Sequence, residues 1–258
     1  MKKIIFIFCF AYIAANITIA QSIHIDSQGI RIENPSDNET RHHPKPKSTH
    51  NKAFFSSIGF IVPNNGSGYF TTLGGSSINL DFGRMHRYQV APQFELGRTL
   101  QYSYYNYRSW NMASNPEFVD EVIGREFNKH GIRKQVFRSH NIAASFFTRF
   151  YLVPDKNRLH IDLGVQGDFA FSKYYKIKTE SEGKRKYRND YAFNPFSASA
   201  IARAGWNRKK CSCTWNGNCC WNNNSRAIFV RYRFTDAFNQ KALPMDLPQL
   251  TIGIQFFY

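Results

Sequence analysis

Four of the five cysteines lie within one ten-residue stretch and form the pattern C-x-C-x5-C-C. Thiols this close together can form disulfides, hold a metal ion or act as a redox pair. In an exported protein the usual outcome is disulfides, and four cysteines allow three pairings that the sequence leaves open. Zinc ligands are usually separated by about two to four residues, unlike this pattern, so we expect two disulfides and keep a metal site and a redox pair as alternatives. This cysteine quartet consists of Cys211, Cys213, Cys219 and Cys220.

Eight charged residues fall on the polar side of alternating segments and could form a buried network. Four acids and four bases would neutralise one another inside a narrow barrel, which side chains fill. His160 beside Asp162 is the nearest approach to a catalytic pair, but no positioned Ser, Cys or Glu completes a triad. We therefore expect a network that fills the lumen, no enzyme activity and no cofactor, with a narrow polar passage as the alternative. The eight residues are Asp81, Glu95, Arg149, Asp162, Asp168, Arg203, Arg231 and Arg233.

A second group of charges is almost wholly basic and crowds one connection and its flanking strand ends. Lysine and arginine recognise phosphate groups, so this group predicts contact with the anionic headgroups of an outer-leaflet glycolipid. A solvated loop, with Glu180, Glu182 and Asp190 interspersed, is the alternative. The six basic residues are Lys176, Lys178, Lys184, Arg185, Lys186 and Arg188.

The N-terminus decides what the basic excess means. The chain has 258 residues, 34 Lys and Arg against 18 Asp and Glu, and a formal net charge of +16, which could indicate nucleic acid or an anionic membrane as partner. Residues 1–20 have the basic start, apolar run and small-residue site of a secretory signal peptide. Export argues against nucleic acid. After residue 20 no apolar run approaches the length of a membrane-spanning helix.

From about residue 52 the chain repeats segments in which apolar and polar or small residues alternate, the period of a β-strand. Residues 159–171 are the clearest case, and thirteen residues span about 43 Å, which is long for a soluble strand. We therefore predict an antiparallel up-and-down transmembrane barrel of about eight strands. The predicted strands are 53–62, 68–84, 90–109, 137–152, 158–177, 190–206, 226–237 and 249–258.

The chain combines a signal peptide, long alternating strands and the final segment LTIGIQFFY. With these features it resembles, over residues 53–258, small outer-membrane β-barrel proteins of the OmpA/OmpX or PorT-like kind. The resemblance implies that Ile254, Phe256 and Tyr258 form the recognition signal for the outer-membrane assembly machinery. The final residue is Tyr258 where the family more often has Phe. The resemblance also implies residence in the cell outer membrane, and the PorT-like kind adds a role in protein secretion with other envelope proteins as partners.

A periplasmic C-terminus, as in that family, assigns the connections to the two sides of the membrane. The long connections 110–136, 178–189 and 238–248 would face outside, and 153–157 would be a short periplasmic turn. Residues 207–225 break this rule, because nineteen residues would then form a periplasmic connection.

Two further segments complete the predicted organisation. Within the first long connection, Asn115, Pro116 and Gly131 are typical of the cap, start and end of one helix, whose apolar stripe would cover the barrel mouth or dock a partner. Residues 21–51 are predicted to form a flexible periplasmic arm ahead of the barrel at 52–258.

These features together predict a non-enzymatic outer-membrane barrel with a closed or nearly closed lumen, whose external loops serve recognition or envelope structure. Its partners would be membrane lipid and glycolipid. Three alternatives remain open: a barrel that assists protein secretion, a narrow porin, and a barrel enzyme that acts on envelope lipid.

Overall fold

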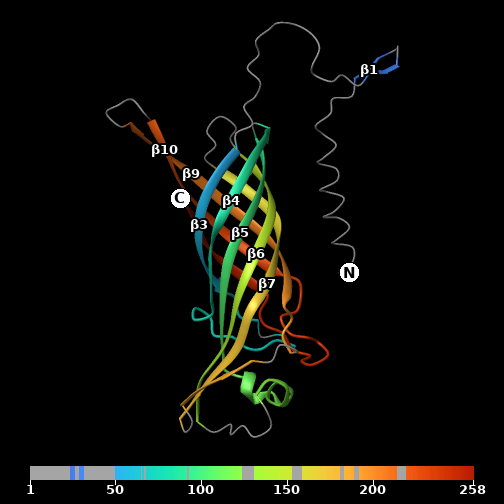
Figure 1. The fold of residues 1–258 in the computed structure, drawn as a ribbon, viewed down its shortest axis with the longest axis vertical. Helices are drawn as coiled ribbons and strands as arrows, with labels where there is room; N and C mark the ends of the chain where they lie inside the picture. The colour runs from blue at the N-terminus through green and yellow to red at the C-terminus, as the bar shows by residue number, and fades with distance from the viewer. Residues whose placement is uncertain are drawn as a thin grey trace. The chain divides into compact units, whose positions relative to one another are not determined.

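A computed structural model gives the fold of the chain (Figure 1). The structure divides into two compact units, Met1–Lys47 and Ser48–Tyr258. The residues it describes are 24–26, 29–31, 50–64, 66, 68–91, 93–123, 131–152, 159–180, 183–188, 192–213 and 219–258, with side chains left out for 24–31 and 207–224. The predicted signal peptide, residues 1–20, lies outside these ranges.

The first unit contributes one small element to the description. Strands β1 (His24–Asp26) and β2 (Gly29–Arg31) pair antiparallel, with Ile25 opposite Ile30. This short hairpin falls in the segment predicted to be a flexible periplasmic arm, which stays a prediction for the rest of that segment.

The second unit is an antiparallel sheet of nine strands that closes on itself. The strand order is β6-β5-β4-β3-β11-β10-β9-β7-β8, and β6 also pairs with β7. That last pairing makes a ring of eight strands and leaves β8 attached to β7 outside it, so the predicted barrel is confirmed with one strand more than expected in its sheet. The strands are β3 (His50–Ile61), β4 (Ile78–Ala91), β5 (Phe94–Ser109), β6 (Ile132–Tyr151), β7 (Leu159–Thr179), β8 (Gly183–Tyr187), β9 (Phe196–Cys213), β10 (Cys219–Arg233) and β11 (Leu250–Phe257).

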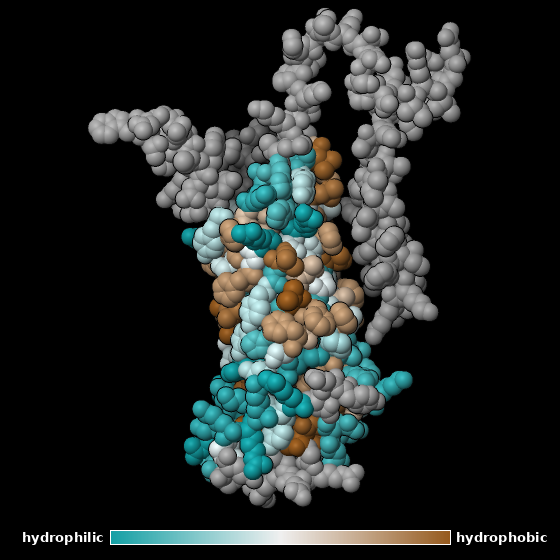
Figure 2. All heavy atoms as spheres, viewed as in Figure 1, coloured by the Kyte–Doolittle hydropathy of each residue, from teal (hydrophilic) through white to brown (hydrophobic). Residues whose placement is uncertain are grey.

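Alternation along each strand separates a lipid-facing wall from a polar interior. Successive side chains point to opposite faces of a sheet, so every second residue faces outward. Leu100 and Phe146 are 62% and 65% exposed, whereas their neighbours Gln101 and Phe147 are each 3% exposed. Figure 2 shows apolar side chains gathered on the middle of the barrel wall, with hydrophilic side chains toward the end that carries the helix. An exposed apolar band of this kind is the surface that a barrel presents to lipid.

The two ends of the ring differ in the length of their connections. One end, here called the loop end, carries residues 62–77, 110–131, 180–195 and 234–249, and the other, the turn end, carries 92–93 and 214–218. The predicted turn at 153–157 lies outside the described residues. Long connections on one side and short ones on the other are the asymmetry of an outer-membrane barrel.

Several predicted strand boundaries are wrong, and those in two regions change the arrangement of the connections. The predicted strand 68–84 begins only at Ile78, because the glycine-rich residues before it form turns, with positive φ at Gly68 and Gly75. The supposed nineteen-residue connection 207–225 is mostly strand, because β9 runs on to Cys213 and β10 begins at Cys219. The exception to the short-turn rule therefore disappears.

A bulge in β7 changes which residues face outward near the loop end. His140 pairs with Ser172 and Asn141 with Ala170, so Phe171 is an extra residue in the β6–β7 ladder. On the turn-end side of the bulge the even-numbered residues of β7 point inward. On its loop-end side the odd-numbered residues do. The bulge thus turns Lys176 outward on the part of the strand near the loop end.

The loop end also holds short helical turns, η2 (Met112–Ser114), α2 (Pro116–Phe118) and η3 (Val119–Ile123). Asn115 caps the first residues as predicted, since its Oδ1 accepts a hydrogen bond of 2.9 Å from the Phe118 amide. The rest of the helix predicted up to Gly131 falls on residues outside the description. Over the part of the chain that is described, no helix has the length and apolar content needed to cross a membrane.

Candidate functional site

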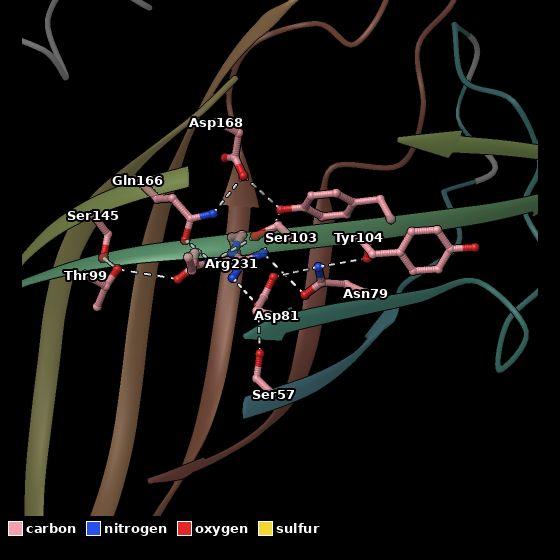
Figure 3. A network of polar contacts seen from close by, with 12 residues as sticks. Ser57, Asn79, Asp81, Thr99, Ser103, Tyr104, Ser145, Gln166, Asp168 and Arg231 are labelled. Carbon is pink, nitrogen blue, oxygen red and sulfur yellow. Dashed lines mark hydrogen bonds and ion pairs between the residues drawn. The ribbon is translucent and has the colours of Figure 1, made fainter. Parts of the chain in front are cut away.

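The middle of the lumen is organised around Arg231 (Figure 3). β10 points this side chain inward, where Nη2 donates to Asp81 Oδ2 at 2.8 Å and Nη1 donates to the Tyr105 hydroxyl at 2.7 Å. Asp81 also accepts hydrogen bonds from Ser57 at 2.7 Å and from Asn79 at 3.0 Å. Side chains from four strands thus meet across the barrel and leave the arginine 4% exposed.

A second charged layer lies closer to the turn end. Arg149 makes a two-pronged contact with Asp162, with N–O distances of 2.7 and 2.9 Å, and Arg203 Nη1 lies 3.7 Å from the same carboxylate. The three residues stand side by side on β6, β7 and β9, because Arg149 and Arg203 are both register partners of Asp162. The Arg203 guanidinium also lies 5.0 Å from the centre of the Phe147 ring. A paired arrangement with such geometry offsets the cost of burying charge.

Two further ion pairs extend the network toward each end, and each contains a residue that the sequence analysis missed. Arg87 Nη1 contacts Glu95 Oε2 at 3.2 Å near the turn end. Arg233 contacts Asp246 at 3.1 Å beneath the loops. Asp246 belongs to a loop without alternation, and Arg87 lies on a strand whose limits were misplaced, so periodicity could not assign either.

The structure places all eight predicted lumen residues in the interior, each 8% exposed or less. The remaining member, Asp168, accepts hydrogen bonds from Gln166 at 2.9 Å and Tyr105 at 3.4 Å. The eight do not form one cluster, because they are distributed over the separate layers described above.

His160 does not form a catalytic pair with Asp162. The imidazole is fully buried, and neither ring nitrogen has a hydrogen-bond partner among the described residues. Its ring packs edge-on against Tyr151 with centroids 6.0 Å apart, and the register places Gly205 opposite it. A base that contacts neither a carboxylate nor a nucleophile lacks the geometry of a catalytic triad.

A compact apolar cluster, here called the cap, lies over the lumen at the loop end. Its side chains come from the strand ends at the loop end and from all the long connections. Phe118 of α2 packs edge-on against Tyr175 and Phe70, with centroids 4.9 and 5.3 Å apart. The apolar stripe of the predicted helix thus covers the barrel mouth. The cap consists of Ile61, Phe70, Tyr105, Tyr107, Met112, Ala113, Phe118, Val122, Phe137, Tyr175, Ile177, Ala192, Phe193, Phe238, Leu243 and Leu247.

Polar groups within the cap are tied to one another. The buried Tyr175 hydroxyl donates a hydrogen bond of 3.1 Å to Gln135 Oε1. Gln135 in turn accepts from the Ala113 amide and donates to the Trp110 carbonyl. These bonds fix the first long connection onto the strands.

Little open space lies between the cap and the Arg231 layer. A cavity there is lined by Tyr105, Ser139, Lys173 and Arg231 among others and has a volume of about 50 Å³. Since a single water needs about 10–15 Å³ by this kind of measure, the cavity could hold only a few waters.

The six predicted headgroup residues lie at the loop end of β7 and along or just after β8. Lys176 and Lys178 point outward on the loop-end side of the bulge, and the register places Lys186 and Lys184 opposite them. Arg185 alternates to the other face of β8, where it lies opposite Ile177. Arg188 follows the strand and is exposed.

The cysteine quartet lies at the ends of β9 and β10, on residues whose side chains are outside the description. The backbone register places Cys213 opposite Cys219 and Cys211 opposite Trp221. The disulfides therefore stay a prediction. Among the residues that are described with side chains, no group of three or more His, Cys, Asp or Glu could hold a metal ion.

The C-terminal strand presents the predicted assembly signal on the lipid-facing wall. Ile254 is 44% and Tyr258 66% exposed, and Phe256 shares their face. The Tyr258 amide donates a hydrogen bond of 2.8 Å to the Phe54 carbonyl, which pairs the last residue with β3.

Comparison with known proteins identifies the family. The family model described as "Outer membrane protein beta-barrel domain" matches residues 50–239, which is well over half of the chain. The chain belongs to this family. The match confirms the predicted family and fold, and it places the barrel in the outer membrane. A search of curated proteins found no match.

Among solved structures, the outer-membrane barrel is similar to a Salmonella typhi chain described as "OmpF complex with Daunomycin". The identity is 8%, with 82% of this chain and 97% of that chain covered, and the TM-score is 0.16. A likeness at that score carries no argument about how this barrel works.

Proposed function

We propose that this chain is a sealed, non-enzymatic outer-membrane barrel that supports recognition or envelope structure from its loop end, which faces outside. The observation that carries the proposal is the double closure of the lumen. Ion pairs in several layers fill the middle of the ring, and the cap covers its outer mouth. The interior of an eight-stranded ring is narrow enough for side chains to fill, so the ion pairs can close the lumen without any extra domain inside it.

The same closure argues against the two other roles of the lumen. A pore needs a continuous water path, and the contact of Arg231 on β10 with Tyr105 on β5 joins opposite sides of the ring. An enzyme acting on lipid needs reactive groups within reach of the lipid, and His160 and Asp162 are fully enclosed. The work of this barrel therefore falls to its surfaces.

Planar-bilayer conductance tests the proposal. The purified barrel, added to a membrane in which a porin serves as positive control, should give no steady current steps. Steps whose ion selectivity changes on Arg231→Gln or Arg233→Gln would instead show a path through the lumen and would overturn the proposal.

A second role, assistance to protein secretion, is supported by one separate feature at the turn end. Among the described residues, β9 pairs with β7 up to Trp206 and β10 pairs with β11 from Ser225 onward. β9 and β10 continue to pair with each other as far as Cys213 and Cys219 (Figure 1). The seven residues 207–213 extend this two-stranded ribbon by roughly 23 Å beyond the rim. A ribbon of this reach on the periplasmic side could contact a soluble partner.

Shortening the ribbon tests the secretion role without touching the ring. Deletion of residues 209–222 should leave the barrel folded and in the outer membrane. If exported proteins then accumulate in the periplasm, the secretion role gains support. If the exported proteins are unchanged, that role is wrong, and the sealed-barrel proposal is unaffected.

A further inference from the structure

Six basic side chains form a continuous surface on the outside of the barrel near the loop end. Four of them, on β7 and β8, belong to the basic group of the sequence, and two come from β6, which the sequence did not connect with them. The surface, here called the cationic wall, consists of Lys134, Arg138, Lys176, Lys178, Lys184 and Lys186.

Strand register sets the cationic wall in rows. Lys178 lies opposite Lys134 on β6 and opposite Lys184 on β8, so three lysines stand side by side across three strands. In the next row Lys176 lies opposite Lys186. Neighbouring strands are about 4.8 Å apart, and like charges directly opposite one another are unfavourable. A sheet that places cations in this way is stabilised by an anion that bridges them.

Within the part of the chain that the structure describes, the residues around the cationic wall do not supply that anion. Glu180 follows β7 directly, and its Oε1 already contacts Arg133 Nε at 3.0 Å. Arg138 donates to the neutral amide of Asn106, and Lys186 lies over the Tyr174 ring, 3.9 Å from its centre. Among the described residues, no carboxylate forms an ion pair with any of the six.

The surface between these cations is hollowed. A depression on the barrel wall is lined by Lys134, Arg138, Lys176, Lys178 and Lys184, with Val136 at its floor. The lining is mostly apolar, made by the aliphatic stems of these side chains and by the buried Val136. A phosphate group held over the depression could be reached by the charged ends of side chains from two or three strands at once.

The position along the barrel indicates where the anion comes from. A group of outward-facing rings lies next to the cationic wall on its turn-end side and consists of Tyr102, Tyr104, His140 and Tyr174. The Tyr102 hydroxyl lies 2.7 Å from His140 Nδ1. Such aromatic groups mark the boundary between the hydrocarbon and the headgroups. Lys176 and Lys178 lie two and four residues farther out than Tyr174, which is about 7 and 13 Å along the strand.

We propose that the cationic wall binds the phosphate groups of an outer-leaflet glycolipid. The inference rests on the proposed function for its orientation, with the loop end outside, and deepens it by naming the lipid partner. Two phosphates on one sugar headgroup could meet the separated rows together. A zwitterionic phospholipid carries its own ammonium group beside the phosphate and would match the wall less well.

Binding of purified lipid to the full-length barrel in nonionic detergent tests the proposal, with native mass spectrometry to count bound molecules. The probes are diphosphorylated lipid A, the same lipid after enzymatic removal of its phosphates, and phosphatidylglycerol. The test variant is Lys176→Gln with Lys178→Gln. The matched control is Lys52→Gln with Arg98→Gln, two exposed outward-facing cations nearer the turn end.

We expect the test variant to bind diphosphorylated lipid A about tenfold more weakly, and the control to bind it as the unaltered barrel does. Removal of the phosphates should weaken binding to the unaltered barrel by a similar factor and should change little in the test variant. Equal binding by the test variant, equal loss in the control, or no dependence on the phosphates would overturn the proposal. Equally tight binding of phosphatidylglycerol would show a general anionic-lipid site and would overturn the assignment to glycolipid.

The outcome is separable from that of the proposed function. The test variant should retain the folded gel mobility of the barrel and its lack of conductance. If it does so and lipid binding is unchanged, the cationic wall proposal alone has failed. If the unaltered barrel conducts, the sealed-barrel proposal has failed, whatever the lipid binding shows.

Discussion

The contact between Arg231 and Asp81 offers the sharpest test of how the lumen is held together. Arg231→Met removes a buried, charge-assisted contact of 2.8 Å and a second contact to the Tyr105 hydroxyl, and it leaves the Asp81 carboxylate enclosed at 1% exposure. Breaking a buried ion pair from one side costs about 3–5 kcal/mol. Ser57 and Asn79 still donate to Asp81, so we expect the lower end of this range, about 3 kcal/mol.

A double-mutant cycle isolates the ion pair from the general cost of substitution. Replacing both partners, as Arg231→Met with Asp81→Leu, removes the unpaired charge, and apolar replacements of this kind are often close to neutral. The double variant should therefore be more stable than the sum of the two single costs implies, by about 2 kcal/mol or more. The exposed, outward-facing Arg98→Met is the matched control and should change stability by less than about 0.5 kcal/mol.

The measurement is urea unfolding in detergent micelles, followed by tryptophan fluorescence and by conversion of the folded to the unfolded gel band. Single costs below about 1 kcal/mol, or costs that simply add in the double variant, would refute the conclusion that paired charges hold the lumen closed.

Three further outcomes are expected, one from the structure and two from the sequence. A Cβ added to Gly97 would overlap the Phe147 ring, so Gly97→Ala should lower the free energy of unfolding by about 1–3 kcal/mol, whereas Gly167→Ala, which meets no atom within 4 Å, should not; urea unfolding of the two variants distinguishes them. Non-reducing electrophoresis of the exported protein, with alkylation of free thiols, should find all four members of the cysteine quartet oxidised, and four alkylated thiols would contradict the disulfides. Deletion of Tyr258 should reduce the amount of folded barrel in the outer-membrane fraction, whereas Tyr258→Phe should not, and an undiminished deletion variant would argue against its role in assembly.

Much of the fold follows from a period of two along the sequence. Alternation identified the ring of strands and assigned residues such as Asp162 and Arg231 to the interior, because a strand has only two faces and the lipid demands that one be apolar. The same reasoning predicted a charge network before any contact was visible. The physical constraint is strong, so the prediction needed no knowledge of which strands are neighbours.

What the sequence did not predict depends on local geometry or on contacts distant along the chain. The bulge at Phe171 is a single extra residue with no signature of its own, yet it turns Lys176 and Lys178 outward. Asp246 approaches Arg233 from a loop whose path no periodicity describes. The pairing of Lys178 with Lys134 depends on the register of two long strands, which composition alone cannot set.

The central claim is that the chain forms a closed barrel in the outer membrane. The most direct measurement is the gel mobility of protein from isolated outer membranes, run in parallel with and without boiling in detergent. The ring joined through the pairing of β6 with β7 predicts that the unboiled protein stays folded and migrates faster than the boiled protein. Equal mobility of the two samples, or recovery of the protein in the soluble fraction, would contradict the closed barrel.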